Sequence, residues 1–294
     1  MRENDIAVIG GSGFVGKQIL DYFFENGISY FAPTSREVDI TNRKSVDEFV
    51  KSFKGKTIAL VAGYANVDDA QTEFGKAMAD RLNVLGTLNV AESAESEGKL
   101  LAYVSTNFVF SGTKKHPGPF FPYSETASIS SPDIGEYARS KLMGERIVKN
   151  TLENYVIVRI SNPFGNYDSE KDFIRKIVEL MEGGYPLWLD QKITLTFLPD
   201  LAAKIVQINS ENLSRILHVV RWPVTTPYEV GKFIFDNYVI KADEVKEGLL
   251  EKYVVGRTPR PLNGGLVPSE RRADIKDWKN AVDRTIYSYY PQRK

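Results

Sequence analysis

Two hydrophobic patterns alternate along the first 160 residues. Short uncharged apolar runs, such as residues 6–9 and 57–62, are typical of strands that are buried on both faces. Between such runs lie longer segments with apolar residues every three or four positions, as in helices that bury one face. The pattern predicts strands at 6–9, 30–32, 57–62, 100–105 and 155–160, and helices at 14–25, 45–53, 74–97 and 136–150. It therefore predicts βαβ units and a parallel, doubly wound α/β sheet.

This alternation ends at Gly165. Downstream we expect helices at 170–182, 199–209 and 226–238, strands at 187–189, 193–197 and 217–220, and a loop-rich stretch at 257–270. The expected organisation is one α/β domain over residues 1–165, to which residues 192–220 return. A smaller, interleaved α+β lobe is expected from residues 166–191 and 221–294.

Composition excludes several classes of protein. The chain has 38 basic and 38 acidic residues among 294, which argues against a nucleic-acid binder. It has no Cys and only two His, so we expect no disulfide and no metal site. No apolar run approaches the ~18 residues of a membrane span, and the first residues lack the apolar stretch of a signal peptide. We expect a soluble, cytoplasmic protein without a membrane partner.

A glycine-rich turn joins the first predicted strand to the first helix. Its glycines fit both G-x-G-x-x-G and G-x-x-G-x-x-G. Glycine lets the backbone turn sharply and approach a pyrophosphate, which then meets N–H groups and the positive end of the helix dipole. A tight turn without a ligand is the alternative, but the strand–loop–helix context favours a dinucleotide. The turn makes residues 1–165 a candidate Rossmann-type NAD(P)-binding domain and leaves the smaller lobe for the substrate; the expected contacts are Gly10, Ser12, Gly13, Phe14, Val15 and Gly16.

The end of the second strand bears on the choice of cofactor. In dinucleotide-binding folds, an acidic residue about 20 positions after the glycines binds the ribose 2′-hydroxyl of NAD. Here that place is taken by Ser35 and Arg36. A hydroxyl and a guanidinium suit a 2′-phosphate, so we expect NADP, used as NADPH, while NAD remains possible. Because Glu37 and Asp39 are close, a solvated Arg36 without a ligand is the alternative.

Tyr137 and Lys141 are spaced i, i+4 and so share one helical face. A cation near a phenol lowers the Tyr pKa, and such a Tyr can protonate a carbonyl oxygen while hydride reaches its carbon. Only this pair lies on the helix between the fourth and fifth strands, next to the sheet edge where such folds bind ligands. The fourth strand ends there with Thr106, whose hydroxyl can orient a carbonyl. The same spacing recurs elsewhere, at Tyr167/Lys171, Tyr228/Lys232 and Tyr290/Lys294.

Together these motifs resemble the extended short-chain dehydrogenase/reductases, and within them most the dTDP-4-dehydrorhamnose reductases. Further matching segments include Asn83-Val84-x-Gly86-Thr87, Lys141-Leu142-x-Gly144-Glu145, Arg159-x-Ser161 and Arg260-Pro261-x-Asn263. The resemblance implies reduction, by NADPH, of a 4-keto group on a nucleotide-linked deoxysugar. It implies a catalytic set of Thr106, Tyr137 and Lys141, with the last two also at the cofactor. It further implies adenine contacts at Asp39 and Ile40 and nicotinamide-side contacts at Ala62, Gly63 and Tyr64.

The chain departs from these reductases after Thr106. They usually carry Asp-Tyr, at positions that help to hold the sugar, where this chain has Asn107-Phe108. The related dehydratases need Asp-Glu there for acid–base chemistry, so a dehydratase is disfavoured. We expect substrate contacts at Asn107, Phe108, Asn162 and Arg260, with Arg260 either at the diphosphate or in water. Residues 111–135 form either a loop that covers the substrate or a surface excursion.

Three functions remain open from the sequence. The first is the reductase, acting on a nucleotide-sugar substrate. The second is a sugar-nucleotide epimerase or dehydrogenase that retains its cofactor. The third is an NADP-binding regulatory subunit, because the beta subunit of methionine adenosyltransferase also resembles these reductases. The 74–97 and Tyr137 helices form dimer faces in many relatives, so the resemblance implies a homodimer.

Overall fold

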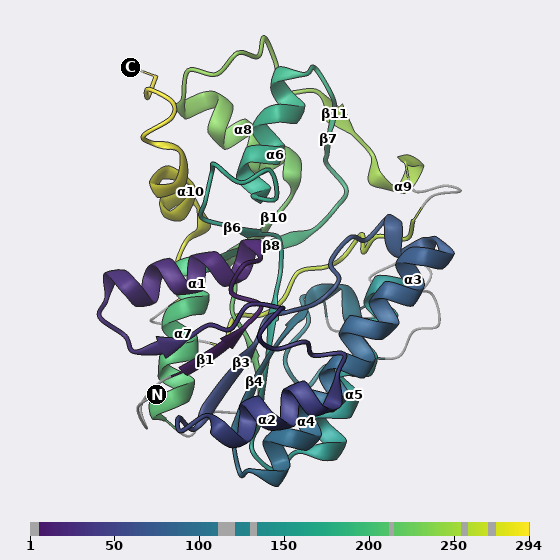
Figure 1. Ribbon diagram of the computed structural model, residues 1–294. Coiled ribbons are helices and arrows are strands. Elements are labelled where there is room, and N and C mark those ends of the chain that lie inside the picture. Colours follow the sequence, from purple (N-terminus) through teal and green to yellow (C-terminus); the bar gives the residue numbers. More distant parts are fainter. Residues whose placement is uncertain are drawn as a thin grey trace. The chain divides into compact units, whose positions relative to one another are not determined.

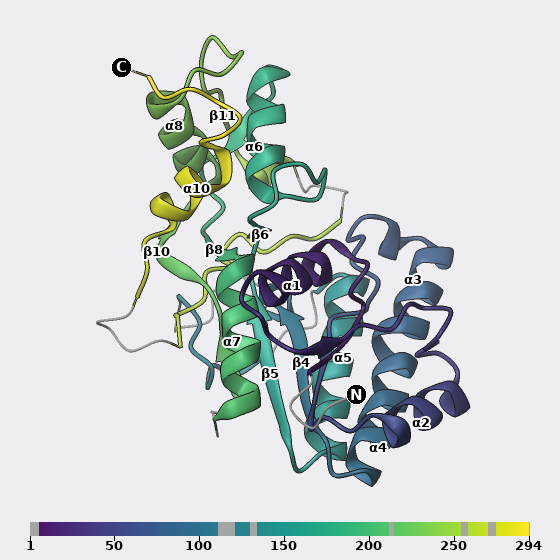
Figure 2. The ribbon, with the colours of Figure 1, turned by 60° about the vertical axis from the view of Figure 1, so that its left-hand side comes forward.

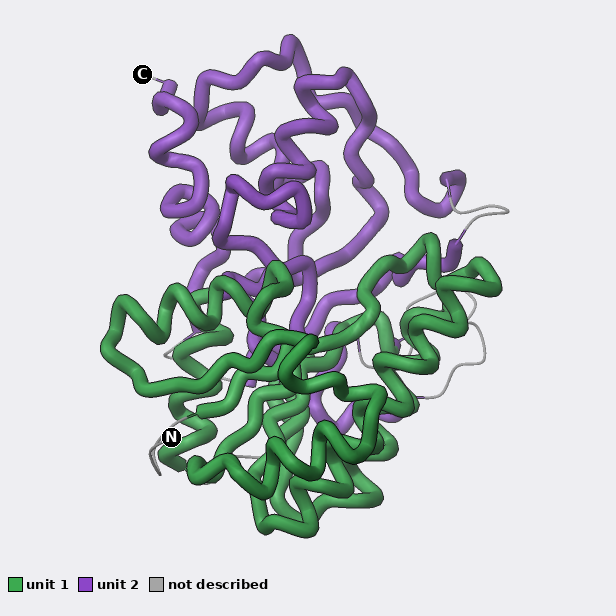
Figure 3. The backbone as a smooth tube through the Cα atoms, in the orientation of Figure 1, with its two compact units in different colours: residues 1–109, 134–159, 199–217 green, residues 110–133, 160–198, 218–294 purple. Residues whose placement is uncertain are grey.

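A computed structural model of the chain describes residues 6–110, 121–129, 134–211, 215–253, 258–269 and 275–293 (Figure 1). The chain forms two compact units, coloured separately in Figure 3. Unit 1 contains residues 1–109, 134–159 and 199–217, and unit 2 contains residues 110–133, 160–198 and 218–294. Among the described residues, no helix combines the length and the apolar character needed to cross a membrane.

Unit 1 is built on a six-stranded sheet with the order β2-β1-β3-β4-β5-β9. The pairs β1–β2, β1–β3 and β3–β4 are parallel. All four residues of β1 and of β3 are buried, as their uncharged runs predict. After β1, the chain adds β2 on one side of it and then β3 on the other side. Sheets of this kind bind ligands where the strand order reverses, so ligands are expected at the carboxyl ends of β1 and β3. The strands are β1 (Ile6–Ile9), β2 (Tyr30–Phe31), β3 (Thr57–Leu60), β4 (Leu100–Thr106), β5 (Tyr155–Ile160) and β9 (Ile216–His218).

Helices cover both faces of this sheet. Figures 1 and 2 show α2, α4 and α5 on one face and α1 and α7 on the other. The core between β-strands and helices includes Ile9, Leu60, Leu101, Phe49 and Val90. The helical segments are α1 (Phe14–Glu25), α2 (Arg43–Ser52), η1 (Asp69–Gln71), α3 (Glu73–Ala79), η2 (Asp80–Leu85), α4 (Gly86–Ser96), η3 (Asn107–Val109), α5 (Glu136–Thr151) and α7 (Leu198–Ser210).

Unit 2 combines short strands with amphipathic helices. Its three-stranded sheet has the order β10-β8-β6, and β7 pairs with β11. Thr226 begins α8 with a capping box. The elements are β6 (Pro163–Phe164), α6 (Phe173–Glu182), β7 (Leu187–Trp188), β8 (Ile193–Phe197), β10 (Arg221–Thr225), α8 (Pro227–Asn237), β11 (Glu247–Gly248), α9 (Leu250–Tyr253) and α10 (Trp278–Ile286).

The doubly wound α/β fold with a smaller α+β unit is confirmed, and three details differ from the sequence analysis. The helix expected at 74–97 is interrupted by the π-helical segment η2. Residues 193–197 pair with β6 and β10, so the return to unit 1 begins at residue 199 instead of 192. The sequence analysis did not anticipate β6, β10 or α10. Most of the 111–135 segment lies outside the described residues, and both of its interpretations stay predictions.

Candidate active site

The glycine-rich turn leads from β1 directly into α1. Gly10 has a φ of +98°, which favours glycine, and its oxygen accepts a hydrogen bond from Gly13 N at 3.1 Å. A Cβ on Gly10 would lie 2.4 Å from Ala62 N, and a Cβ on Gly16 would lie 2.2 Å from Gly10 O. The turn therefore needs glycine at both positions in order to pack this closely against the end of β3.

The N-terminus of α1 is open to an anion. The helix begins at Phe14, so its first amides have no partner within the helix. No side chain caps it, and its first turn contains no acidic residue. Ser12 and Gly13 are exposed, while Phe14 and Val15 are partly buried. These features fit a dinucleotide pyrophosphate, whose charge the free amides and the helix dipole would stabilise.

Ser35 and Arg36 form an exposed turn after β2. The neighbouring Glu37 carboxylate is held by Thr34, which donates from N at 2.8 Å and from Oγ1 at 2.9 Å. These hydrogen bonds lower the pKa of Glu37. The carboxylate is thus engaged within its own turn, and the exposed guanidinium of Arg36 is the charged group that this turn offers to a ligand.

The loops after β2 and β3 place the other expected cofactor residues. Asp39 is exposed, and its carboxylate accepts hydrogen bonds from Thr41 N at 2.9 Å and Thr41 Oγ1 at 2.8 Å, which lower its pKa. Ile40 is buried, with 5% exposed. After β3, Ala62 N donates to Ile9 O at 2.9 Å, so the chain leaves the sheet beside β1.

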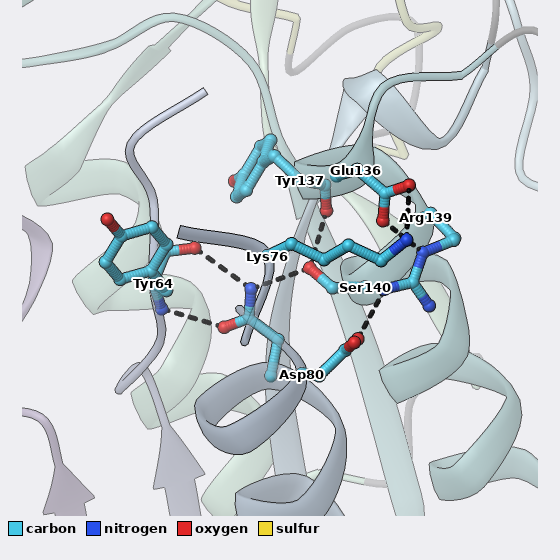
Figure 4. Close-up of polar contacts among 8 residues, drawn as sticks. Tyr64, Lys76, Asp80, Glu136, Tyr137, Arg139 and Ser140 are labelled. Carbon is cyan, nitrogen blue, oxygen red and sulfur yellow. Dashed lines mark hydrogen bonds and ion pairs between the residues drawn. The ribbon is translucent and has the colours of Figure 1, made fainter. Parts of the chain in front are cut away.

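Gly63 and Tyr64 are anchored by the π-helical segment. Asn83 in η2 is buried, and its amide bonds the Tyr64 backbone twice, at 2.8 Å to N and 2.9 Å to O. The same amide donates to Ser140 Oγ at 2.9 Å, and Ser140 bonds the Tyr137 carbonyl at 2.8 Å (Figure 4). A Cβ on Gly63 would lie 2.7 Å from Asn83 Oδ1. The interruption of the long helix therefore has a structural role, which the sequence analysis missed.

Tyr137 is partly buried in the first turn of α5. Burial raises the pKa of its phenol to about 12, while a hydrogen bond with Thr106 opposes the shift. The hydroxyl of Thr106 also accepts a hydrogen bond from Phe108 N at 3.2 Å. This hydrogen bond brings the end of β4 and the start of α5 together, and the catalytic role of the two hydroxyls stays a prediction.

The ammonium group of Lys141 contacts β4. Its Nζ donates to Val104 O at 2.8 Å and lies 4.0 Å from the centre of the Tyr103 ring. Burial lowers the pKa of Lys141 to about 7, against the Glu145 charge, which raises it. The prediction that this cation lowers the Tyr137 pKa is wrong for the described structure, because the desolvation of the phenol dominates.

Surface ion pairs fix the first turn of α5 from outside. Glu136 accepts from Lys76 Nζ at 3.2 Å and from Arg139 Nε at 2.6 Å. Arg139 also pairs with Asp80 in η2, and Figure 4 shows this group beside Tyr137. Each exposed pair contributes little alone, but together they join α5 to the helices α3 and η2.

The expected sugar contacts lie in both units. In unit 1, Asn107 is buried, and the Phe108 ring meets the Tyr137 ring edge-on at 5.8 Å between centroids. In unit 2, Asn162 has a φ of +44°, and its amide donates to Ser161 Oγ at 3.0 Å and Thr194 O at 3.2 Å. Arg260 is partly buried in unit 2 and bonds the backbone of its own loop.

Comparison with known proteins identifies the family. The sequence model described as "RmlD substrate binding domain" matches residues 4–290. The chain belongs to this RmlD family. It is 29% identical to the dTDP-4-dehydrorhamnose reductase of Aggregatibacter actinomycetemcomitans, over 97% of this chain and 98% of that protein. It is 26% identical to methionine adenosyltransferase 2 subunit beta of Xenopus tropicalis, over 88% of this chain and 79% of that protein.

A solved structure supports the RmlD-family fold. The crystal structure of dTDP-4-dehydrorhamnose reductase from Bacillus anthracis str. Ames, in complex with NADP, superimposes with a TM-score of 0.82. The match covers 98% of this chain and 100% of that chain, at 24% sequence identity. The RmlD-family fold therefore extends over nearly the whole chain.

Proposed function

We propose that this RmlD-family chain uses NADPH to reduce a 4-keto group on a nucleotide-linked deoxysugar. The observation that carries the proposal is the pairing of Thr106 with Tyr137 at the end of β4, in the same unit as the glycine turn. The family match and the reductases among the relatives support the same reaction. The intact set of Thr106, Tyr137 and Lys141 favours chemistry over binding alone.

The cofactor residues fit a dinucleotide phosphate. The open N-terminus of α1 would hold the pyrophosphate, and Ser35 with Arg36 would hold a 2′-phosphate. The turns with Asp39 and Ile40 and with Ala62 to Tyr64 would line the rest of the cofactor. When bound, NADPH supplies the hydride. NAD is the alternative cofactor.

Tyr137 would supply the proton. A phenol with a pKa of about 12 stays protonated at neutral pH, which suits a general acid that donates to an alkoxide oxygen. The Thr106 hydroxyl would share that oxygen and orient it. We expect Asn107, Phe108, Asn162 and Arg260 to hold the sugar nucleotide. Asn107 and Phe108 replace the usual Asp-Tyr, so the accepted sugar need not be that of the relatives.

Substitution of Tyr137 tests the proposal. Tyr137→Phe removes only the hydroxyl, and we expect it to keep NADPH binding and to lose at least 100-fold in turnover (about 10²–10⁴ for a general acid). The matched control is Tyr228→Phe in α8, which has a lysine at the same spacing. Turnover is followed as NADPH consumption with a panel of nucleotide-linked 4-ketosugars. Unchanged turnover in Tyr137→Phe would remove this role.

The match to methionine adenosyltransferase 2 subunit beta supports a second candidate. A regulatory subunit of that kind would bind NADPH without consuming it. The same assay separates the two: NADPH that binds with no turnover on any ketosugar favours the regulator. Tightly retained NAD in the purified protein would instead favour an epimerase.

We further propose that the chain acts as a homodimer in the cytoplasm. Phe74 and Leu85, on the interrupted helix, are 70% and 45% exposed, which leaves apolar surface that a second copy of the chain would cover. Light scattering of the purified protein should give twice the monomer mass. Replacement of Phe74 and Leu85 by Ser should give monomers.

A further inference from the structure

A buried ion pair joins α5 to β5 one helical turn beyond Lys141. The side chains of Arg159 and Glu145 are 1% and 0% exposed. Arg159 donates to the carboxylate from Nε at 2.9 Å and from Nη2 at 2.8 Å, and Ser105 Oγ donates to it at 2.7 Å. A two-pronged guanidinium contact of this kind fixes direction as well as distance. Glu145 is therefore held by β4 and β5 together.

Tyr137, Lys141 and Glu145 follow one another at four-residue intervals on α5, so they share one face. That face meets β4 through consecutive residues: Val104 accepts from Lys141, and Ser105 donates to Glu145. The carboxylate is thus part of the same row of contacts that positions the expected catalytic side chains.

Several groups surround Lys141. On its own helix Tyr137 and Glu145 each lie four residues away, and on β4 the Tyr103 ring and the Val104 carbonyl contact its ammonium group. Glu145 opposes the burial that lowers the pKa of Lys141. Two further cations lie near the Glu145 carboxylate. Arg159 on β5 is 2.8 Å from it, and Lys149 on the next turn of α5 is 4.0 Å from it.

Stability alone is a poor reason for this arrangement. A buried ion pair often contributes no more to folding than apolar residues of the same size, because both charges lose their hydration. An anion beside a buried lysine has a separate effect, since it favours the charged amine. We propose that Glu145, clamped by Arg159 and Ser105, is a positioning residue whose charge favours the ammonium form of Lys141 at the end of β4. The catalytic consequence rests on the proposed reductase function.

Substitution of the two partners of the ion pair should shift the titration midpoint of Lys141 in opposite directions. Glu145→Gln removes the anion and leaves Arg159, so the titration midpoint of Lys141 should fall by about one pH unit or more. Arg159→Met leaves the anion without its partner, so the midpoint should rise. A merely structural pair predicts the same direction, or no shift, in both variants, because both break the same contact.

The readout is independent of catalysis. Lysine labelled with ¹³C at Cε gives one NMR signal per residue, and the Lys141 signal is the one missing in Lys141→Met. The signal of Lys51, an exposed lysine on α2, serves as the control and should be the same in all variants. If a single variant fails to fold, the double variant Glu145→Gln/Arg159→Met buries neither charge and should fold. Its Lys141 midpoint should lie below that of the wild type.

Turnover separates this inference from the proposed function. The alkaline limb of the kcat profile should move to lower pH in Glu145→Gln and to higher pH in Arg159→Met. Shifts of equal sign, or an unmoved Lys141 midpoint in the double variant, would overturn the role of Glu145. A wild type without turnover on any ketosugar, but with opposite NMR shifts, would overturn the reductase and keep the charge coupling.

Discussion

Two glycines of the α1 turn should separate folding from cofactor binding. In Gly16→Ala, the new Cβ would lie 2.2 Å from Gly10 O and 2.8 Å from Gly11 Cα. An unstrained contact between carbon and oxygen is about 3.3 Å, so Gly16 and Gly10 would have to move apart by about 1 Å. Gly10 has little room to move, because even a Cβ added to it would lie 2.4 Å from Ala62 N. Such overpacking costs about 1–3 kcal/mol.

That cost sets the expected size of the effect. The Tm should fall by about 2–12 °C, taking about 2–4 °C per kcal/mol for a domain of this size. The amides of Phe14 and Val15 would move with the turn. NADPH affinity should therefore fall at least tenfold, which corresponds to about 1.4 kcal/mol.

Gly13→Ala is the matched comparison in the same turn. Gly13 has a φ of −76°, and its Cβ would have a single neighbour, Gly10 O at 3.4 Å. Its stability should change by less than about 0.5 kcal/mol. Because Gly13 is exposed at the start of α1, the methyl group should still weaken NADPH binding. The Tm is measured by calorimetry and NADPH binding by titration calorimetry. A Gly16→Ala protein with wild-type Tm and affinity would refute the reasoning.

Three further predictions follow from the site. Arg36→Ala should raise the KM for NADPH much more than for NADH, and equal effects on both would remove its role at the 2′-phosphate. Asn83→Ala should lower stability by about 1–3 kcal/mol in denaturant unfolding, because it leaves the Tyr64 backbone unpaired; no loss would contradict the anchoring role. Lys141→Met should abolish turnover and raise stability at pH 7. The pKa of Lys141 falls from 10.5 to about 7, so the unfolded chain binds more protons between these values and stability rises with pH there. At about 1.36 kcal/mol per pH unit, the buried amine costs up to about 5 kcal/mol. A Tm of Lys141→Met that is unchanged or lower at pH 7 would be inconsistent with this cost.

Local sequence determined the elements of unit 1. The uncharged runs at 6–9 and 57–60 can only be buried on both faces, and the glycines between β1 and α1 follow from steric limits that operate within a few residues. The spacing of Tyr137 and Lys141 placed both on one face of α5 for the same reason. These features depend on periodicity and on backbone geometry, which are properties of short segments.

Tertiary structure decided what surrounds those residues. The pKa of Tyr137 rises and that of Lys141 falls because the fold removes both side chains from water, and this desolvation depends on strands far away in sequence. The π-helical turn at Asn83 exists where its amide meets the backbone of Tyr64, 19 positions earlier. Glu145 meets Ser105, 40 positions earlier, and β8 joins a separate sheet through β6 and β10. Hydrophobic periodicity shows which face of an element is buried, but it does not identify the residues that pack against that face, because many different neighbours can cover the same apolar surface.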